Sequence, residues 1–350
     1  MENIFALKLI NWYQQYKRDL PWRKTKDPYK IWLSEIILQQ TRVAQGAPYY
    51  ISFVENFPSI HDLAKADEQE VLKLWQGLGY YSRARNLHAT AKKIVLEHDG
   101  EFPNTFDKLL KLKGIGDYTA SAIASFCFDE VVPTLDGNVY RVLSRFLGIE
   151  TPIDSHQAKK EFKNIAFELI NPKNPGIFNQ AIMEFGALQC TPSSPNCSNC
   201  IFNDSCVALQ KNKVQLLPIK NKKLKIKKRF FNYLIYKTPA MKTMIERREK
   251  NDIWKHLFQF PLIETESELD ILNFYTFLEK SAYKDLKIKN IKLINPTSTI
   301  HKLTHQEINI KFWEINLEYN SNELIDWNQI SQFPFPIIIH NFIEKYMKDC

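Results

Sequence analysis

Apolar residues recur at three- and four-residue steps through residues 1–210, which is the period of helices that bury one face. Phe5, Leu9, Trp12 and Tyr16 already follow this spacing near the start of the chain. Glycines and prolines separate the apolar segments, as is typical of short connections between helices. The pattern therefore predicts an all-α region, with further helices at 28–44, 46–56, 67–75, 82–98, 105–111, 117–127, 136–147, 156–170 and 176–188.

The pattern changes after residue 211, where short aromatic and β-prone segments appear. Strands are expected at 230–236, 241–246, 289–294 and 307–317, and helices at 266–280 and 336–347. This second region is predicted to be α+β. We expect a helical domain at 1–210, a linker at 211–228 and an α+β domain at 229–350.

Positive charge is in excess along the 350 residues, with a formal net charge of +8 and a pI near 8.9. This balance favours a polyanionic partner. Its most basic run extends from Lys220 to Arg229. Two interpretations fit this run: contact with DNA phosphates, or a solvated linker that leads into an edge strand, which we favour.

Charged residues interrupt the apolar residues at the N-terminus, so neither a signal peptide nor a membrane span is expected there. Elsewhere no apolar run approaches the roughly 18 residues of a transmembrane helix. With 44% hydrophobic residues the chain can bury a sizeable core. We therefore expect a cytoplasmic globular protein without a membrane partner.

Four of the six cysteines, from Cys190 to Cys206, have the spacing C-x6-C-x2-C-x5-C. In a cytosolic chain such a cluster predicts a metal site more than a disulfide framework. Zinc sites with four cysteines usually show two C-x2-C pairs held well apart, whereas this segment has one. The spacing leaves zinc open and favours an iron–sulfur cluster.

The segment Leu112–Ala120 contains Gly114 and Gly116 and is followed by an alanine-rich helix. Two glycines at this spacing let backbone N–H groups approach a phosphate at a helix N-terminus. The segment has the form of a helix-hairpin-helix DNA-binding element, although a plain turn has the same glycine spacing. Asp136 follows about twenty residues on, in a stretch poor in other polar residues.

The order of glycine hairpin, Asp136 and four-cysteine loop resembles the endonuclease III-like superfamily of DNA glycosylases, and within it the MutY family. The similar strings are Leu20-Pro-Trp-Arg23, Trp32 to Thr41, Gly77-Leu-Gly-Tyr-Tyr81, Arg83 to His88, Leu135 to Val139 and Phe178-Asn-Gln-Ala181. The resemblance is dense over 1–210 and thinner beyond it. It implies a mainly α catalytic region with a [4Fe–4S] cluster on Cys190, Cys197, Cys200 and Cys206, followed by a Nudix-like α+β domain.

Two strings depart from the family's pattern. Lys113 stands in the hairpin where proline is common, and Leu303-Thr304-His305 replaces a usual Phe-Ser-His. The second domain also lacks a Nudix box, so we expect it to read 8-oxoguanine, chiefly through Thr304 and His305, rather than to hydrolyse a pyrophosphate.

Removal of a base from a nucleoside needs an acid on the base side and a carboxylate beside the cationic sugar. The resemblance makes Glu35 the acid, Asp136 the carboxylate that faces the sugar, and Asn138 its positioning partner. Glu35 sits in an apolar run, so burial is expected to raise its pKa. Each carboxylate also has a structural interpretation: Glu35 as a satisfied core residue and Asp136 as a helix N-cap.

Tyr118 stands where bifunctional endonuclease III-like enzymes carry the lysine that attacks the sugar. Tyrosine offers no amine, so the resemblance implies a hydrolase without efficient strand cleavage. Two alternatives remain open: a bifunctional glycosylase/lyase for oxidised pyrimidines, and a non-catalytic DNA-binding protein with a structural metal.

The implied substrate is duplex DNA with adenine opposite 8-oxoguanine or guanine, bound by a monomer in a bacterial-type, nucleoid-associated setting. Adenine must be flipped out of the stack before it is removed. The residues that match family positions for these contacts are Arg18, Trp22 and Gln180 beside the extruded base, Gln40 and Tyr80 as wedges in the duplex, and Gly114 and Gly116 at the phosphates.

Overall fold

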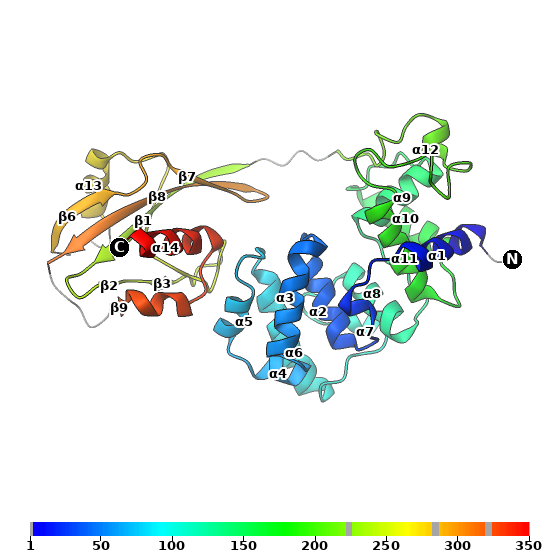
Figure 1. The fold of residues 1–350 in the computed structure, drawn as a ribbon, viewed down its shortest axis with the longest axis horizontal. Coiled ribbons are helices and arrows are strands. Elements are labelled where there is room, and N and C mark those ends of the chain that lie inside the picture. The colour runs from blue at the N-terminus through cyan, green and yellow to red at the C-terminus, as the bar shows by residue number, and fades with distance from the viewer. Residues whose placement is uncertain (1–2, 222–225, 282–286, 319–323, 350) are drawn as a thin grey trace. The chain divides into compact units, whose positions relative to one another are not determined.

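Tertiary contacts divide the chain into two compact units (Figure 1). The computed structural model describes residues 3–221, 226–281, 287–318 and 324–349. A helical unit comprises Met1–Lys65 and Asn86–Lys222, and a mixed unit comprises Ala66–Arg85 and Lys223–Cys350. Residues 66–85 therefore group with the C-terminal part of the chain. The sequence-based boundaries at 210 and 228 stay predictions.

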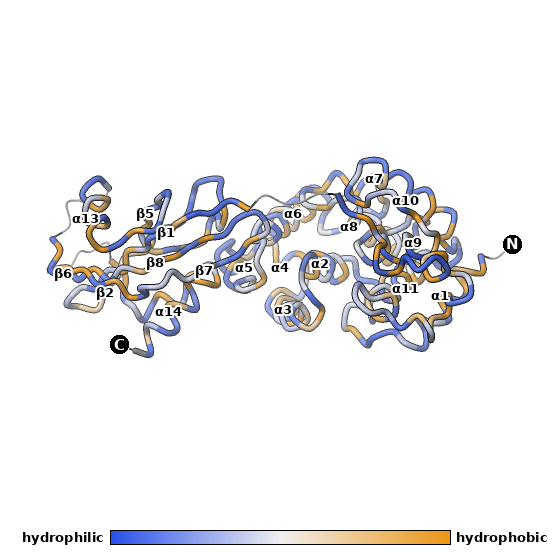
Figure 2. The backbone as a smooth tube through the Cα atoms, turned by 90° about the horizontal axis from the view of Figure 1, so that it is seen from above, coloured by the Kyte–Doolittle hydropathy of each residue, from blue (hydrophilic) through white to orange (hydrophobic). Residues whose placement is uncertain are grey.

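The helical unit is built of helices joined by short connections. They are α1 (Ile4–Tyr16), η1 (Pro21–Arg23), α2 (Pro28–Leu38), α3 (Val43–Asn56), α4 (Ile60–Lys65), α6 (Ser82–His98, entering from the mixed unit), α7 (Phe106–Leu109), α8 (Asp117–Phe128), α9 (Gly137–Leu147), α10 (His156–Leu169), α11 (Pro175–Leu188) and α12 (Val207–Gln210). Apolar and polar residues alternate along them (Figure 2). No helix in the described parts of the chain is long and apolar enough to cross a membrane.

The predicted helix over 28–44 is wrong at its C-terminal end. The helix α2 begins after Asp27, whose side chain accepts a hydrogen bond from the Tyr29 N–H, and it ends at Leu38. Gln40 then adopts a φ of 58°, in the left-handed region that a right-handed helix excludes. The resulting turn separates α2 from α3, and Thr41 and Arg42 after it line the cavity described below.

Helix α11 lies at the centre of the helical unit and packs against α1, α8 and α9. Its Phe178 and Phe185 share one apolar core with Phe5 of α1 and Val142 of α9. The Phe5 ring also stacks on Phe202, 4.7 Å between centroids, which ties the cysteine-bearing loop to this core. Each such buried side chain contributes about 1.5–3 kcal/mol to stability.

The mixed unit is built on one sheet with the strand order β5-β1-β8-β6, in which β7 also pairs with β8. Its elements are α5 (Glu68–Leu74), β1 (Lys227–Lys237), β2 (Lys242–Thr243), β3 (Glu246–Arg247), β4 (Phe258–Gln259), β5 (Leu262–Thr265), α13 (Ile271–Glu279), β6 (Ile288–Leu293), β7 (Thr299–Lys302), β8 (Gln306–Leu317), β9 (Ile325–Asp326), η2 (Trp327–Gln332) and α14 (Ile337–Asp349). The two long strands, β1 and β8, run parallel in continuous register. The α+β prediction is confirmed.

Adjacent side chains of β8 point to opposite faces of the sheet, and each face receives a helix. Trp313 stacks on Phe274 of α13 with 3.9 Å between ring centroids. Phe312 stacks on Phe342 of α14 with 3.7 Å between centroids. The sheet is therefore sandwiched between α13 and α14 (Figure 1).

The interpretation of residues 220–229 as a linker into an edge strand is wrong in its second half. Strand β1 is central, because β5 pairs with one side of it and β8 with the other. Arg229 is only 9% exposed and forms ion pairs with Asp252 and Glu264. Residues 222–225 of the run lie outside the described residues.

The close packing of α11 on α9 generates a prediction. A Cβ at Gly186 would lie 2.6 Å from the Asn138 Cβ, whereas a Cβ at Gly137 would meet nothing within 4 Å. Gly186→Ala should therefore lower the free energy of unfolding by about 1–3 kcal/mol, and Gly137→Ala should leave it nearly unchanged. Denaturant melts of both variants measure this difference. Equal stability of the two would contradict the packing argument.

Candidate active site

A cavity of about 570 Å³ opens within the helical unit, and the predicted catalytic residues Glu35, Tyr118, Asp136 and Asn138 line it. They come from α2, α8 and the start of α9, three elements that are far apart in sequence. This volume is within the range of pockets that bind small molecules. The cavity is therefore large enough to receive a nucleobase.

Glu35 is 7% exposed and lies among apolar neighbours on α2. Burial raises the pKa of its carboxyl to about 7, because the charged form loses its hydration; the nearby Asp136 adds to the rise. The Tyr118 hydroxyl donates a hydrogen bond of 2.6 Å to Oε2 and acts in the opposite direction. The burial predicted for Glu35 is confirmed, and near neutral pH this group can hold a proton.

Tyr118 is a fixed hydrogen-bond donor at this site. Burial, together with the charges of Glu35 and Asp136, raises the pKa of its hydroxyl well above the usual value. The same hydroxyl lies 3.9 Å from the Met183 sulfur. Tyr118 therefore stays protonated and holds one oxygen of Glu35 in place, which leaves the other oxygen of that carboxyl to the cavity.

Asp136 is the N-cap of α9, as its structural interpretation predicted. Its Oδ1 accepts from the N–H groups of Asn138 at 2.9 Å and Val139 at 2.8 Å, and its Oδ2 accepts from the Asn138 amide at 2.7 Å. Burial raises the pKa of Asp136, and these hydrogen bonds oppose that rise. The Asp136 side chain therefore both caps α9 and lines the cavity.

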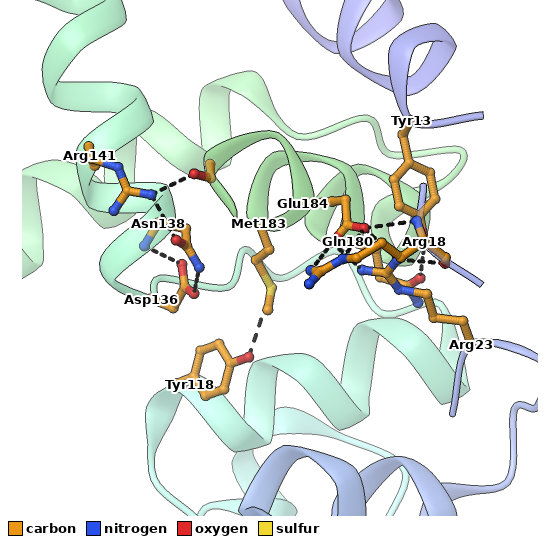
Figure 3. A network of polar contacts seen from close by, with 11 residues as sticks. Tyr13, Arg18, Arg23, Tyr118, Asp136, Asn138, Arg141, Gln180, Met183 and Glu184 are labelled. Carbon is orange, nitrogen blue, oxygen red and sulfur yellow. Dashed lines mark hydrogen bonds and ion pairs between the residues drawn. The ribbon is translucent and has the colours of Figure 1, made fainter. Parts of the chain in front are cut away.

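Arg141 lies beside this N-cap (Figure 3) and also hydrogen-bonds to the cysteine loop. Its guanidinium donates to Asn138 Oδ1 at 2.8 Å, to the Gly186 carbonyl at 2.6 Å and to the Cys190 carbonyl at 2.8 Å. It is 8% exposed. The orientation of Asn138, and through it that of Asp136, thus depends on a residue that also holds the first cysteine's backbone.

A third buried carboxylate, Glu184 of α11, forms the opposite wall (Figure 3). Burial alone would raise its pKa, but paired hydrogen bonds from Arg18 and Arg23, between 2.6 and 2.9 Å, lower it to about 2. Glu184 is therefore ionised at all working pH values. Hydrogen bonding to Glu184 also raises the pKa of Arg18.

Gln180 stands one helical turn before Glu184 and its amide is oriented by Tyr13. The Tyr13 hydroxyl donates to Gln180 Oε1 at 2.6 Å, so the amide N–H groups remain for another acceptor. Trp22 is buried, lines the same cavity and meets Tyr50 edge-on at 5.1 Å between centroids. The structure thus brings Arg18, Trp22 and Gln180 together around one space.

Four residues of this site were not predicted from the sequence to have a role: Glu184, Arg23, Arg141 and Tyr13. A signal for Glu184 was present, because it follows Gln180 by four residues and therefore shares its helix face. Arg23 ends the Leu-Pro-Trp-Arg string. Nothing in the local sequence identified the link from Arg141 to Cys190 or that from Tyr13 to Gln180, since these partners lie at sequence separations of 49 and 167.

The glycine hairpin presents the N-terminus of α8. Gly114 has a φ of +78°, and a Cβ there would lie 2.8 Å from the Asn86 Cβ. Gly116 is the N-cap without a side-chain cap, and a Cβ there would meet nothing within 4 Å. The first N–H groups of α8 therefore remain accessible to an anion.

The predicted wedge and lesion-reading residues fall in different units. Gln40 is exposed in the helical unit. Tyr80 is 50% exposed, belongs to the mixed unit and lies with its hydroxyl 2.5 Å from Thr304 Oγ1. His305 is exposed beside Thr304, and its carbonyl accepts from the Lys227 N–H at 2.9 Å. Tyr80, Thr304 and His305 line one pocket of about 370 Å³ within the mixed unit.

The four clustered cysteines are half-buried free thiols around a common small pocket, which Arg145 also lines. Arg145 lies with Nη1 3.5 Å from Cys190 Sγ and donates to the carbonyls of Thr191 and Pro192. Within the described residues no three His, Cys, Asp or Glu side chains converge as ligands of one metal ion.

Comparisons with known proteins agree with this geometry. Residues 33–167 match the HhH-GPD superfamily of base excision DNA repair proteins, and residues 232–345 match the NUDIX domain. The chain is 38% identical over 324 residues to the adenine DNA glycosylase of Buchnera aphidicola subsp. Schizaphis graminum, covering 91% of this chain and 89% of that protein.

Two solved structures are similar in fold to about 59% of this chain. A thermostable thymine-DNA glycosylase superposes with a TM-score of 0.56 and 27% identity, covering 59% of this chain and 96% of that one. Endonuclease III in a non-covalent DNA complex superposes with a TM-score of 0.52 and 21% identity, covering 59% and 94%. At the latter identity the likeness concerns the fold alone.

The buried Glu35 generates a prediction about pH. Because its pKa rises from 4.5 to about 7 on folding, the unfolded chain releases this proton at lower pH than the folded chain. Glu35 therefore costs stability as pH rises from about 4.5 to 7, and the cost levels off above that. Glu35→Gln should stabilise the protein by about 1–3 kcal/mol at pH 8 and by little at pH 4.5. Denaturant melts at both pH values measure it; a pH-independent difference would contradict the assigned burial.

Proposed function

This chain belongs to the MutY family of adenine DNA glycosylases, and we propose that it flips adenine out of duplex DNA and removes it from mispairs with 8-oxoguanine or guanine. The observation that carries the proposal is the pair of carboxylates, buried Glu35 and half-buried Asp136, on one base-sized cavity. The enzyme is a hydrolase of base excision repair, and its partner is DNA. We further infer that it acts as a monomer in the cytoplasm.

The two carboxylates divide the chemistry by their environments. Protonated Glu35 donates its proton to a ring nitrogen of the flipped adenine, so that the electron pair of the breaking glycosidic bond leaves with a neutral base. Asp136 faces the sugar, where positive charge develops, and Asn138 orients it. Water then adds to the sugar carbon and releases a proton, which returns to the Glu35 carboxylate left by the first step.

Tyr118 makes this reaction hydrolytic. The position holds a phenol that stays protonated, and the described residues lining the cavity include no lysine that would attack the sugar. A bifunctional glycosylase/lyase is therefore the less favoured alternative. Tyr118 instead positions Glu35 by its hydrogen bond.

Adenine itself is read at the opposite wall. Gln180 offers N–H donors to ring nitrogens, while Glu184, kept ionised by Arg18 and Arg23, accepts from the exocyclic amine. Trp22 supplies an apolar surface to the base. This combination of donor and acceptor fits adenine and opposes a base that carries a carbonyl in place of the amine.

The opposite strand is read elsewhere. We assign Tyr80, Thr304 and His305 to 8-oxoguanine, Gln40 to the space beside the lesion, and Gly114 and Gly116 to the phosphates. The contact between Tyr80 and Thr304 supports this assignment, because it brings a wedge residue and a lesion-loop residue to one place.

Cys190, Cys197, Cys200 and Cys206 would hold a [4Fe–4S] cluster. The donor set fits, because four free cysteine thiols line one small pocket and four thiolates are the usual ligands of such a cluster. Thiolate ligation would fix the loop 190–206. Arg145 offers positive charge to the thiolates. Arg141 hydrogen-bonds to both the Cys190 carbonyl and Asn138, so an ordered loop would help to fix Asn138.

A single-turnover assay tests the assignment of Glu35. Wild type should excise adenine opposite 8-oxoguanine and guanine, leave a duplex with an oxidised pyrimidine intact, and slow as pH rises above about 7. Glu35→Gln should lose about 10²–10⁴ in rate while binding the duplex, because it cannot protonate the base. Near-wild-type excision by Glu35→Gln, or strand cleavage by wild type, would overturn the assignment.

Iron content tests the cluster. Wild type purified without oxygen should contain about four irons per chain, and Cys200→Ser should contain less and bind duplex DNA more weakly. Cys127→Ser is the matched control, since Cys127 lies outside the loop and should leave iron unchanged. Stoichiometric zinc without iron in wild type would exclude the cluster.

A further inference from the structure

Residues 66–85, which carry Tyr80, form hydrogen bonds near both ends with the hairpin that joins β3 to β4. At the first end, Glu68 Oε1 lies 2.7 Å from His256 Nδ1 and 3.1 Å from Arg247 Nη2. At the second end, Arg85 Nη1 donates to the Lys255 carbonyl at 2.8 Å. The β3–β4 hairpin therefore holds both the beginning and the end of residues 66–85.

Side chains in the middle of the segment hydrogen-bond to backbone groups of residues 333–335. The Phe335 N–H donates to Gln76 Oε1 at 3.0 Å, and the Lys73 ammonium donates to the Phe333 carbonyl at 3.2 Å. These contacts hold the C-terminal end of α5. They leave Glu68 as the ionic anchor of its N-terminal end.

The segment is stiff enough to carry a displacement from Glu68 to Tyr80. Helix α5 begins with a capping box between Asp67 and Glu70, so its first turn is fixed. Beyond the helix, the Trp75 indole donates to the Gly79 carbonyl at 3.0 Å. The Arg83 guanidinium lies 5.0 Å from the Trp75 ring and 5.6 Å from the Tyr80 ring.

The hairpin that Glu68 contacts, between β3 and β4, is held by ion pairs and a backbone hydrogen bond. Asp252 forms ion pairs with Arg229 at 2.8 Å and with Arg248 at 3.0 Å. The His256 N–H donates to the Arg248 carbonyl at 2.7 Å, and His256 has a φ of 66°, which fixes a tight turn. Asp252 and Trp254 of this loop also line the pocket formed with Thr304 and His305.

We propose that Glu68 is a positioning residue for lesion reading: its pairing with His256 and Arg247 keeps Tyr80 in register with Thr304 and so sets the preference for 8-oxoguanine over guanine opposite adenine. The proposal rests on the assignment of Tyr80 and Thr304 above. Glu68 acts through these residues and does not contact the DNA base. Glu35 and Asp136 lie in the other unit, so the chemical step does not depend on Glu68.

The experiment compares wild type, Glu68→Gln, His256→Asn and the double variant. Asparagine at 256 tolerates the left-handed backbone. Each single variant should lower the ratio of excision rates on A:8-oxoguanine over A:G by about 2- to 5-fold, the size expected for one partly exposed charged hydrogen bond. The double variant should lose no more than Glu68→Gln alone, because Glu68→Gln already removes the pairing of the carboxylate with His256 as well as with Arg247. Glu249→Gln is the matched control, since Glu249 is 64% exposed and lies 3.8 Å from His256.

Hydrogen exchange of the amides in 76–82 provides a readout that does not depend on base recognition. Glu68→Gln should accelerate their exchange while the melting temperature stays close to that of wild type. An unchanged excision ratio, additive losses in the double variant, or unchanged exchange would each overturn the proposal. If wild type itself shows no preference for 8-oxoguanine, the lesion-reading assignment fails, whereas the exchange result still decides whether Glu68 anchors the segment.

Discussion

Three carboxylates that are largely withdrawn from water within one helical unit, Glu35 and Glu184 buried and Asp136 half-buried, are the constraint on which the site depends. A carboxylate taken out of water is costly unless it is paired, hydrogen-bonded or protonated. Different partners offset the lost hydration of Glu184, Asp136 and Glu35. Glu184 is paired with two arginines, Asp136 caps a helix, and Glu35 accepts a hydrogen bond from Tyr118.

The differences in protonation follow from these partners. The pKa of Glu184 falls to about 2, while that of Glu35 rises to about 7. A charged acceptor and a proton donor therefore face the same cavity at neutral pH. Paired titratable groups whose environments separate their pKa values are the pattern expected of acid catalysis on one scaffold.

Helix α11 makes this arrangement possible. It carries Gln180 and Glu184 on its cavity face and contacts α8 and α9 through glycines that admit no side chain. A Cβ at Gly176 would lie 2.5 Å from the Ser125 carbonyl of α8. The distances between the three carboxylates thus depend on backbone approach, and the Arg141 contacts extend the same framework to the cysteine loop.

The sequence by itself determined the helices of 1–210, the β-rich second region, the cysteine loop and the buried position of Glu35, because each depends on local periodicity or spacing. It could not place Arg229, whose partners Asp252 and Glu264 are 23 and 35 residues away, nor identify β1 as a central strand. The end of α2 was missed because a left-handed residue at Gln40 has no local signature in this sequence. Tertiary structure alone decided the pairing of Glu184 with Arg18 and Arg23 and the grouping of 66–85 with the C-terminal residues, since both arise from contacts between segments distant along the chain.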